Sequence, residues 1–254
     1  MLLKNQTNNK MSVILEICAA SYNSALAAAA GGADRIELCS GLSEGGLTPS
    51  YGLLKSVMKI PKLKKHVLIR PRGGDFLYTK EEVMLMAEDI HIAKDLGADG
   101  VVIGALTQDG DIDKDVINIL MENAKGMNVT FHRAFDLCRN PLEAMEDIIS
   151  LGCDSILTSG QAPTAEKGIV LLKEMVDFAR GRINIMAGSG VSTNNICKII
   201  NETGVTEIHA SAKGVVPSKM KYRHPGVTMG NADADEYTCI ETIQETVELL
   251  KSQV

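Results

Sequence analysis

The sequence predicts an α/β fold, a (β/α)8 TIM barrel in a single domain, and three observations support this prediction. One pattern repeats eight times: a short apolar, often β-branched run, a turn rich in Gly, Ser, Thr or Asp, and a longer segment with helical spacing. No linker separates the repeats, and 254 residues with 45% hydrophobic content suffice for one large core. The dinucleotide-binding fingerprint G-x-G-x-x-G does not follow the first strand, which disfavours the alternative of a doubly wound open sheet.

The eight expected strands are short apolar runs, each followed by a helical segment. Along the chain, the strands cover residues 13–18, 34–39, 66–70, 100–104, 128–132, 155–158, 183–187 and 206–209. The expected helices cover residues 24–30, 49–58, 81–96, 115–124, 141–150, 165–179, 194–201 and 236–250. Pro49 and Pro141 suit the first turn of the second and fifth helices, because the N–H that proline lacks has no helical partner there.

Small-residue turns connect several helices to the next strand. The turns Gly31-Gly32-Ala33-Asp34, Leu96-Gly97-Ala98-Asp99 and Leu151-Gly152-Cys153-Asp154 precede the second, fourth and sixth strands. A helix that ends on glycine and passes directly into a strand is typical of parallel β/α repeats. The longest irregular stretch, residues 210–235, lies between the eighth strand and the last helix, and its length indicates function or mobility.

Composition restricts the kind of partner and the compartment. The net charge of -6 and the pI near 5.4 argue against nucleic-acid binding, so small molecules or ions are the expected partners. Residues 1–10 are polar and resemble neither a secretory signal nor a membrane span, so we expect a disordered leader, a barrel domain at residues 11–254 and no membrane partner. Six unevenly spaced cysteines without a secretory signal indicate free thiols in the reducing cytoplasm.

Functional residues of such a barrel are expected at the carboxyl ends of its strands. The first strand ends Leu15-Glu16-Ile17-Cys18 and the second ends Ile36-Glu37-Leu38-Cys39. Side chains alternate along a strand, so Glu16 shares a face with Cys18, and Glu37 shares one with Cys39. Because neighbouring strands lie about 4.8 Å apart, two thiols and two carboxylates are expected to converge at one side of the mouth. The alternative is that the cysteines are small buried hydrophobes.

A dense group of charges, Arg70-Pro71-Arg72-Gly73-Gly74-Asp75, follows the third strand. Two arginines on alternate residues of a strand point to one face, and on a pocket wall they would form a fork for carboxylate or phosphate. We therefore assign Arg70, Arg72 and Asp75 to ligand binding. The alternative is that these arginines are solvated or paired with nearby acids.

Further polar residues end the fifth to eighth strands. Those assigned to ligand binding are Arg133, Asp136, Thr158, Ser159, Gly188, Gly190 and Ser211. The two glycines precede a helix amino terminus, a usual place for a phosphate in this fold. Glu37, His132 and His209 are the candidate catalytic residues: the first two would exchange protons, and His209 would orient a substrate or polarise a carbonyl. A cationic segment at residues 213–224 also indicates an anionic ligand.

At these motifs the chain resembles the CutC family, which is named for copper homeostasis. The matching segments are Leu15-Glu16-Ile17-Cys18, Gly32-Ala33-Asp34-Arg35-Ile36-Glu37-Leu38-Cys39, Glu44-Gly45-Gly46-Leu47-Thr48-Pro49-Ser50, Ile69-Arg70-Pro71-Arg72-Gly73-Gly74-Asp75-Phe76, Thr130-Phe131-His132-Arg133-Ala134-Phe135-Asp136 and Leu157-Thr158-Ser159-Gly160. The resemblance implies a cytosolic (β/α)8 protein, often oligomeric, with a role in copper handling. It also implies that Cys18 and Cys39 correspond to two cysteines proposed to bind Cu(I) in animal members.

Several functions therefore compete. The first is a copper homeostasis protein in which Cys18 and Cys39 bind Cu(I), since thiolates are soft ligands, with Glu16 and Glu37 tuning the thiols. The alternative is a TIM-barrel enzyme of unknown reaction on a small anionic, phosphorylated or carboxylated, metabolite, with or without a divalent cation. No strand ends on a lysine, which disfavours imine chemistry. We expect no organic cofactor and a homo-oligomer, and an interaction scaffold is the third hypothesis.

Overall fold

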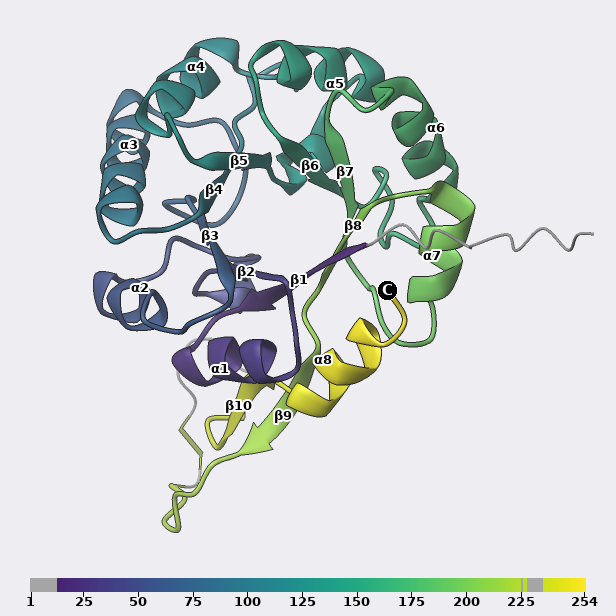
Figure 1. Ribbon diagram of the computed structural model, residues 1–254. Helices are drawn as coiled ribbons and strands as arrows, with labels where there is room; N and C mark the ends of the chain where they lie inside the picture. Colours follow the sequence, from purple (N-terminus) through teal and green to yellow (C-terminus); the bar gives the residue numbers. More distant parts are fainter. Residues whose placement is uncertain (1–12, 225, 228–234) are drawn as a thin grey trace, which may run out of the picture.

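The computed structural model describes residues 13–224, 226–227 and 235–254, and within them the predicted strands close into a parallel barrel (Figure 1). The barrel strands are β1 (Ile14–Ala19), β2 (Arg35–Leu38), β3 (Lys64–Leu68), β4 (Gly100–Ile103), β5 (Asn128–Phe131), β6 (Ser155–Thr158), β7 (Asn184–Ala187) and β8 (Glu207–Ala210). Strand β1 pairs with both β2 and β8, so the sheet has no free edge. The predicted (β/α)8 TIM barrel is confirmed.

Helices surround the barrel and cover its outer face (Figure 1). They are α1 (Tyr22–Ala30), α2 (Tyr51–Val57), α3 (Lys80–Asp95), α4 (Lys114–Asn123), α5 (Pro141–Ser150), α6 (Ile169–Ala179), α7 (Ile196–Thr203) and α8 (Gln244–Lys251), with short 3-10 helices η1 (Leu42–Glu44) and η2 (Arg133–Leu137). Pro141 occupies the first turn of α5, as predicted. The prediction for Pro49 is wrong by two positions, because Ser50 is the N-cap of α2 and the helix begins at Tyr51.

The hydrophobic core lies between the barrel strands and the helices. Leu15, Ile17, Ile36 and Leu38 are fully buried there. The intervening residues of β1 and β2 have the opposite direction and point into the barrel, where charged side chains replace apolar ones. The residues that face the helices therefore stabilise the fold, and those that face inward are available for chemistry.

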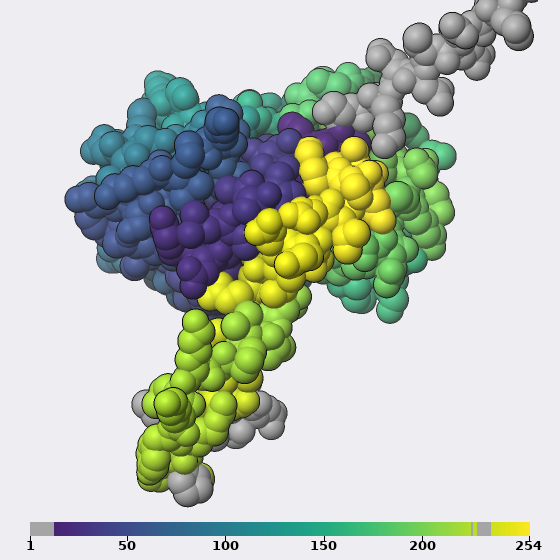
Figure 2. Space-filling view, turned by 60° about the horizontal axis from the view of Figure 1, so that its bottom comes forward, coloured from purple at the N-terminus to yellow at the C-terminus, as the bar shows by residue number. Residues whose placement is uncertain are grey.

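The segment after β8 contains a correction to the predicted elements. Residues Lys213–Pro217 form β9 and pair antiparallel with β10 (Thr238–Thr242), so the helix expected over 236–250 begins only at Gln244. Pairing with β9 overrides the weak helical spacing of this segment, whose Thr238, Ile240 and Thr242 suit a strand. The hairpin projects from the barrel (Figures 1 and 2), and its strand β9 begins within the predicted cationic segment.

The leader predicted at residues 1–10 lies outside the described residues, and the extent of the domain stays a prediction. In the part of the chain that the structure describes, none of the helices combines the length and the apolar content that crossing a bilayer requires.

Candidate functional site

A cavity of about 550 Å³ opens at the carboxyl ends of the barrel strands. Most of the side chains predicted for the site line it. These are Cys18, Glu37, Arg70, His132, Arg133, Asp136, Gly190, His209 and Ser211. The alternation of β-strand side chains and the parallel strand direction bring these distant residues to one rim. The volume is in the range of small-molecule sites.

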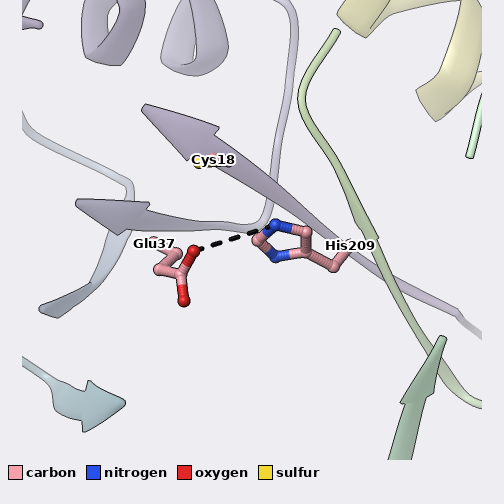
Figure 3. A group of neighbouring side chains, drawn as sticks. All are labelled: Cys18, Glu37 and His209. Atoms are coloured by element: carbon pink, nitrogen blue, oxygen red, sulfur yellow. Dashed lines mark ion pairs between the residues drawn. The ribbon is translucent and has the colours of Figure 1, made fainter. Parts of the chain in front are cut away.

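Four of the lining and adjacent side chains form a potential metal site. The Sγ atoms of Cys18 and Cys39 lie 3.6 Å apart, and Nε2 of His209 lies 3.8 Å from Oε2 of Glu37. One ligand atom from each of Cys18, Glu37 and His209 lies within 4.8 Å of the others, and Figure 3 shows Glu37 facing His209 beside Cys18. The strand register produces this cluster, because Cys18 pairs with Glu37 and β8 is the other neighbour of β1.

The environment of this cluster changes the pKa values of its members. The hydrogen bond with Cys39 and then burial raise the pKa of the Cys18 thiol well above its usual value. Burial alone would lower the pKa of His209, but hydrogen bonds with Cys18 and Glu16 and the charges of Glu37 and Glu16 raise it overall. Burial raises the pKa of Glu37. At neutral pH, the cluster therefore holds a thiol beside an imidazolium, and a bound metal must displace protons.

A buried charge network lies beneath the cluster, and it centres on Arg35. Arg35 forms ion pairs with Glu16 and Glu207, and Oε1 of Glu16 lies 2.8 Å from Nδ1 of His209. Burial opposes ionisation of Glu16, but Arg35 and His209 lower its pKa to about 2, so it stays a carboxylate. Arg35 is a site residue that the strand-end patterns of the sequence did not indicate. Its position two residues before Glu37, on the same face of β2, was the signal that could have identified it.

His132 lies on another part of the cavity wall, and hydrogen bonding fixes its tautomer. Its side chain is buried, with 4% of the residue exposed, and Nδ1 accepts a hydrogen bond of 3.1 Å from the backbone N–H of Ala134. Burial, and then the charge of Arg70, lower the pKa of His132 to about 3. The ring is therefore neutral, with its proton on Nε2, and this atom has no hydrogen-bond partner among the described residues.

Arg70 also lines the cavity, but most of its donors hold the surrounding loops. Nη1 donates to the carbonyl oxygens of Glu44 and Gly46, and Nη2 donates to that of Gly74. The guanidinium lies over the Phe76 ring, 5.1 Å from its centroid. Nε is buried and has no partner in the described part of the chain. This N–H therefore lacks an acceptor at ordinary hydrogen-bond distance among the described residues. The hydroxyl of Tyr78, whose pKa burial raises to about 12 although the charge of Arg70 lowers it, is likewise unpaired among them.

The predicted fork of two arginines does not form. Arg72 and Asp75 lie outside the cavity: Nε of Arg72 donates to Glu82 at 2.6 Å, and Arg72 also pairs with Asp75 at 3.1 Å. Strand β3 ends at Leu68, so the alternation on which the prediction depended does not extend to residues 70–72. Arg72 instead pairs with nearby acids, which was the alternative stated above.

A hydrogen-bond network brings together three further predicted residues, Asp136, Thr158 and Ser159. Asp136 accepts hydrogen bonds from the Thr158 hydroxyl at 2.5 Å and from the N–H and hydroxyl of Ser159 at 3.0 Å. Arg133 donates to Asp136 at 2.7 Å and to the Ser159 hydroxyl at 3.2 Å. This network fixes the loop after β6 to η2, and Arg133 and Asp136 present its inner side to the cavity.

The glycines after β7 have different roles. A Cβ on Gly188 would lie 2.6 Å from Cδ1 of Leu157 and 3.2 Å from Cβ of His209, so the lack of a side chain permits close packing behind the site. Gly190 has a φ of +69° and lines the cavity together with Ser189, which has a φ of +77°. Ser211, which follows β8, also lines it.

Comparison with known proteins identifies the family and agrees with the fold. The model of the CutC family matches residues 13–214. A family protein CutC from Bacteroides fragilis is 51% identical over 249 residues, covering 95% of this chain and 98% of the relative, and one from Parabacteroides distasonis is 53% identical over 239 residues, covering 93% and 98%. The crystal structure of a proposed copper homeostasis protein CutC from Streptococcus agalactiae has a TM-score of 0.75 and 34% identity, covering 78% of this chain and 97% of that one.

Proposed function

Because the chain belongs to the CutC family, we propose that it is a copper homeostasis protein that binds Cu(I) between the thiols of Cys18 and Cys39. The observation that carries this proposal is the 3.6 Å separation of the two Sγ atoms beside the mouth cavity. Thiolates are soft donors, and a pair of them suits Cu(I) better than it suits magnesium or calcium. A cytosolic location, where thiols stay reduced, is part of the proposal.

His209 is the proposed third ligand. Its Nδ1 faces Glu16 at 2.8 Å, which leaves Nε2 on the side of Cys18 and Glu37. A metal-binding histidine commonly donates its other N–H to a carboxylate, which fixes the ring and strengthens the ligand. The positive charge of Arg35 behind Glu16 keeps that carboxylate ionised. Strand β8 thus supplies a third metal ligand, the His209 imidazole, in addition to the two thiols.

Glu37 has a different part in this proposal. A carboxylate is a hard donor and a poor ligand for Cu(I), so Glu37 is placed to accept the proton that a cysteine releases. It stands opposite Cys18 in the register and 3.8 Å from His209. Transfer of the thiol proton to the Glu37 carboxylate would leave a thiolate for the metal and would neutralise the carboxylate.

The test is an anaerobic Cu(I) titration in competition with a chromophoric chelator. We expect the double variant C18S/C39S to lose the high-affinity site. The matched control is C197S/C239S, which removes two thiols as well, but exposed ones. This control should bind Cu(I) as the parent does. Equal Cu(I) affinity in the parent and in C18S/C39S would refute the proposal.

The divalent-cation variant of the enzyme hypothesis has less support. Of the described residues, Cys18, Glu37 and His209 are the group that brings three or more potential ligands together, and His132 is not in it. Glu16 is engaged by Arg35 and His209. Metal analysis of the freshly purified protein separates the alternatives, since copper with sulfur ligands agrees with the proposed site, and magnesium or manganese does not.

A further inference from the structure

We propose that the part of the mouth cavity bounded by Arg70, Phe76 and His132 is a second binding site, which holds a carboxylate or phosphate group of a small organic molecule. This site is separate from the thiols and does not require that they bind copper. No residue in it is a member of the Cys18, Glu37 and His209 cluster.

Two buried hydrogen-bond donors that find no partner in the described part of the chain point to a ligand. They are Nε2–H of His132 and Nε–H of Arg70, in residues that are 4% and 6% exposed. A buried donor that stays unpaired destabilises the protein, so such groups normally meet a partner. Both residues line the cavity, so a molecule in the cavity can supply the partner.

The two residues that carry these donors contact the same aromatic ring and are held in place by their neighbours. The His132 ring lies 4.9 Å from the Phe76 ring, and it packs so closely on Gly104 that a Cβ there would approach its Nδ1 to 2.4 Å. The Arg70 guanidinium stands 5.1 Å from the same Phe76 ring and is fixed by three backbone carbonyls. Because both groups contact one aromatic ring, they border the same part of the cavity.

The chemistry of these groups selects the ligand. Neutral His132 with an occupied Nδ1 and an arginine are both donors only, so the ligand atom between them must be an acceptor. Lys213 and Arg133 also line the cavity. Of its two carboxylates, that of Asp136 is bound by Arg133 and Ser159, and that of Glu37 belongs to the cluster with Cys18 and His209. This cationic lining on a protein of net charge -6 favours an anionic oxygen over a neutral one.

The remaining walls favour an organic molecule over a free inorganic ion. Leu68, Phe76, Leu157 and Val191 line the cavity, and its volume of about 550 Å³ far exceeds that of a single anion. Binding pockets for small molecules combine such apolar walls with a few convergent polar groups. We therefore assign the carbon skeleton of the ligand to these walls and its oxyanion to Arg70 and His132.

The experiment compares two substitutions of His132 that leave the net charge at neutral pH unchanged. In H132N, the amide oxygen can still accept from the Ala134 N–H, but no N–H reaches the position of Nε2. In H132Q, the amide nitrogen can occupy the position of Nε2, but the contact with Ala134 is lost. The two variants thus distinguish the contribution of the Nε2–H donor from that of the hydrogen bond by which His132 caps η2.

Isothermal titration calorimetry with inorganic phosphate and with citrate, on the full chain, supplies the affinities and distinguishes the two oxyanion sources. We expect at least one anion to bind the parent and H132Q with similar affinity, and to bind H132N at least about tenfold more weakly, the factor expected for about 1.4 kcal/mol. Cu(I) affinity should be the same in all three proteins, so failure of this proposal is distinct from failure of the copper proposal.

Absence of binding by both anions, or equal affinity in the parent and H132N, would overturn the inference. If circular dichroism shows that a variant does not fold, an NMR measurement on the parent protein alone still tests the proposed site. In NMR spectra of the protein with ¹⁵N-labelled histidines, the chemical shift of the His132 Nε2–H resonance should change as the anion saturates the site. An unmoved resonance at saturating phosphate and citrate refutes the site.

Discussion

Replacement of Arg35 by methionine tests the charge network beneath the metal cluster. The Arg35 side chain is 9% exposed, and its partners Glu16 and Glu207 have side chains that are 0% and 5% exposed. Methionine is flexible and of similar length, so the main consequence of R35M is the loss of charge and not the loss of packing. Two buried carboxylates then remain without their shared cation, although Glu16 keeps its contact with His209.

The size of the effect follows from the lowered pKa of Glu16. Burial raises this pKa, and Arg35 followed by His209 lowers it from 4.5 to about 2 overall. At about 1.4 kcal/mol per pKa unit, this shift corresponds to about 3 kcal/mol of stability. Removal of one partner from a buried ion pair costs about 3–5 kcal/mol in general. We therefore expect R35M to lower the free energy of unfolding at neutral pH by about 3–5 kcal/mol.

The pH dependence gives the sharper test. A carboxylate with a lowered folded pKa stabilises the protein above its unfolded pKa of 4.5, and this contribution is lost as the pH falls towards 2. Without Arg35, burial dominates and raises the folded pKa, so protonation of Glu16 at low pH relieves the destabilisation. The difference in stability between parent and R35M should therefore shrink as the pH falls from about 7 to about 4.

Urea denaturation followed by circular dichroism measures both quantities. The matched control is R182M, which breaks an exposed pair whose side chains, Arg182 and Glu146, are 40% and 52% exposed. We expect this control to lose less than about 1 kcal/mol at any pH. A loss in R35M no larger than that in R182M, or a difference from the parent that is the same at both pH values, would refute the reasoning.

Other expected outcomes concern packing, helix ends and metal binding. Gly188→Ala places a Cβ 2.6 Å from Leu157 Cδ1 and should cost about 1–3 kcal/mol in urea unfolding, and unchanged stability would contradict the close packing behind His209. Gly52→Ala adds a Cβ with no atom within 4 Å in helix α2, so it should raise stability by about 0.5–1 kcal/mol, and a loss would argue against a helix there. Thr79→Ala removes the capping box of α3 and should lower the free energy of unfolding by about 1 kcal/mol, a cost that an unaltered urea midpoint would rule out. Because the hydrogen bond with Cys39 and burial raise the pKa of the Cys18 thiol, the apparent Cu(I) affinity should increase with pH and binding should release protons to a pH indicator; a Kd independent of pH would mean that Cys18 is not a ligand.

Side-chain alternation placed residues correctly within β1 and β2 and failed beyond the end of β3. Alternation along β1 and β2 placed Glu16, Cys18 and Glu37 on inward positions, and the structure confirms their convergence. The same rule failed for Arg72, because β3 ends at Leu68 and the following loop turns that side chain towards Glu82. Alternation is a property of extended backbone, and the sequence does not mark the residue where the extension stops.

The hairpin β9–β10 shows a second limit. The short runs that form it carry no strong signal individually, since each strand is stabilised by a partner whose paired residues lie 21 to 29 positions away in the sequence. The sequence pattern of residues 236–250 was compatible with one helix, and the pairing of Thr238–Thr242 with Lys213–Pro217 decided otherwise. Contacts between distant segments override local preference in such cases.

By itself, the sequence determined the order of the eight barrel strands with their helices and the inward direction of Glu16, Cys18 and Glu37, because hydrophobic periodicity and side-chain alternation are local properties. Only the tertiary structure decided which polar groups meet and which stay unpaired. Closure of β1 against β8 brings His209 to Glu16, and Arg35 reaches Glu207 across the barrel interior. The free donors of Arg70 and His132 likewise depend on loops far apart in the chain. Hydrogen-bond satisfaction is a property of the whole closed barrel, and no single segment encodes it.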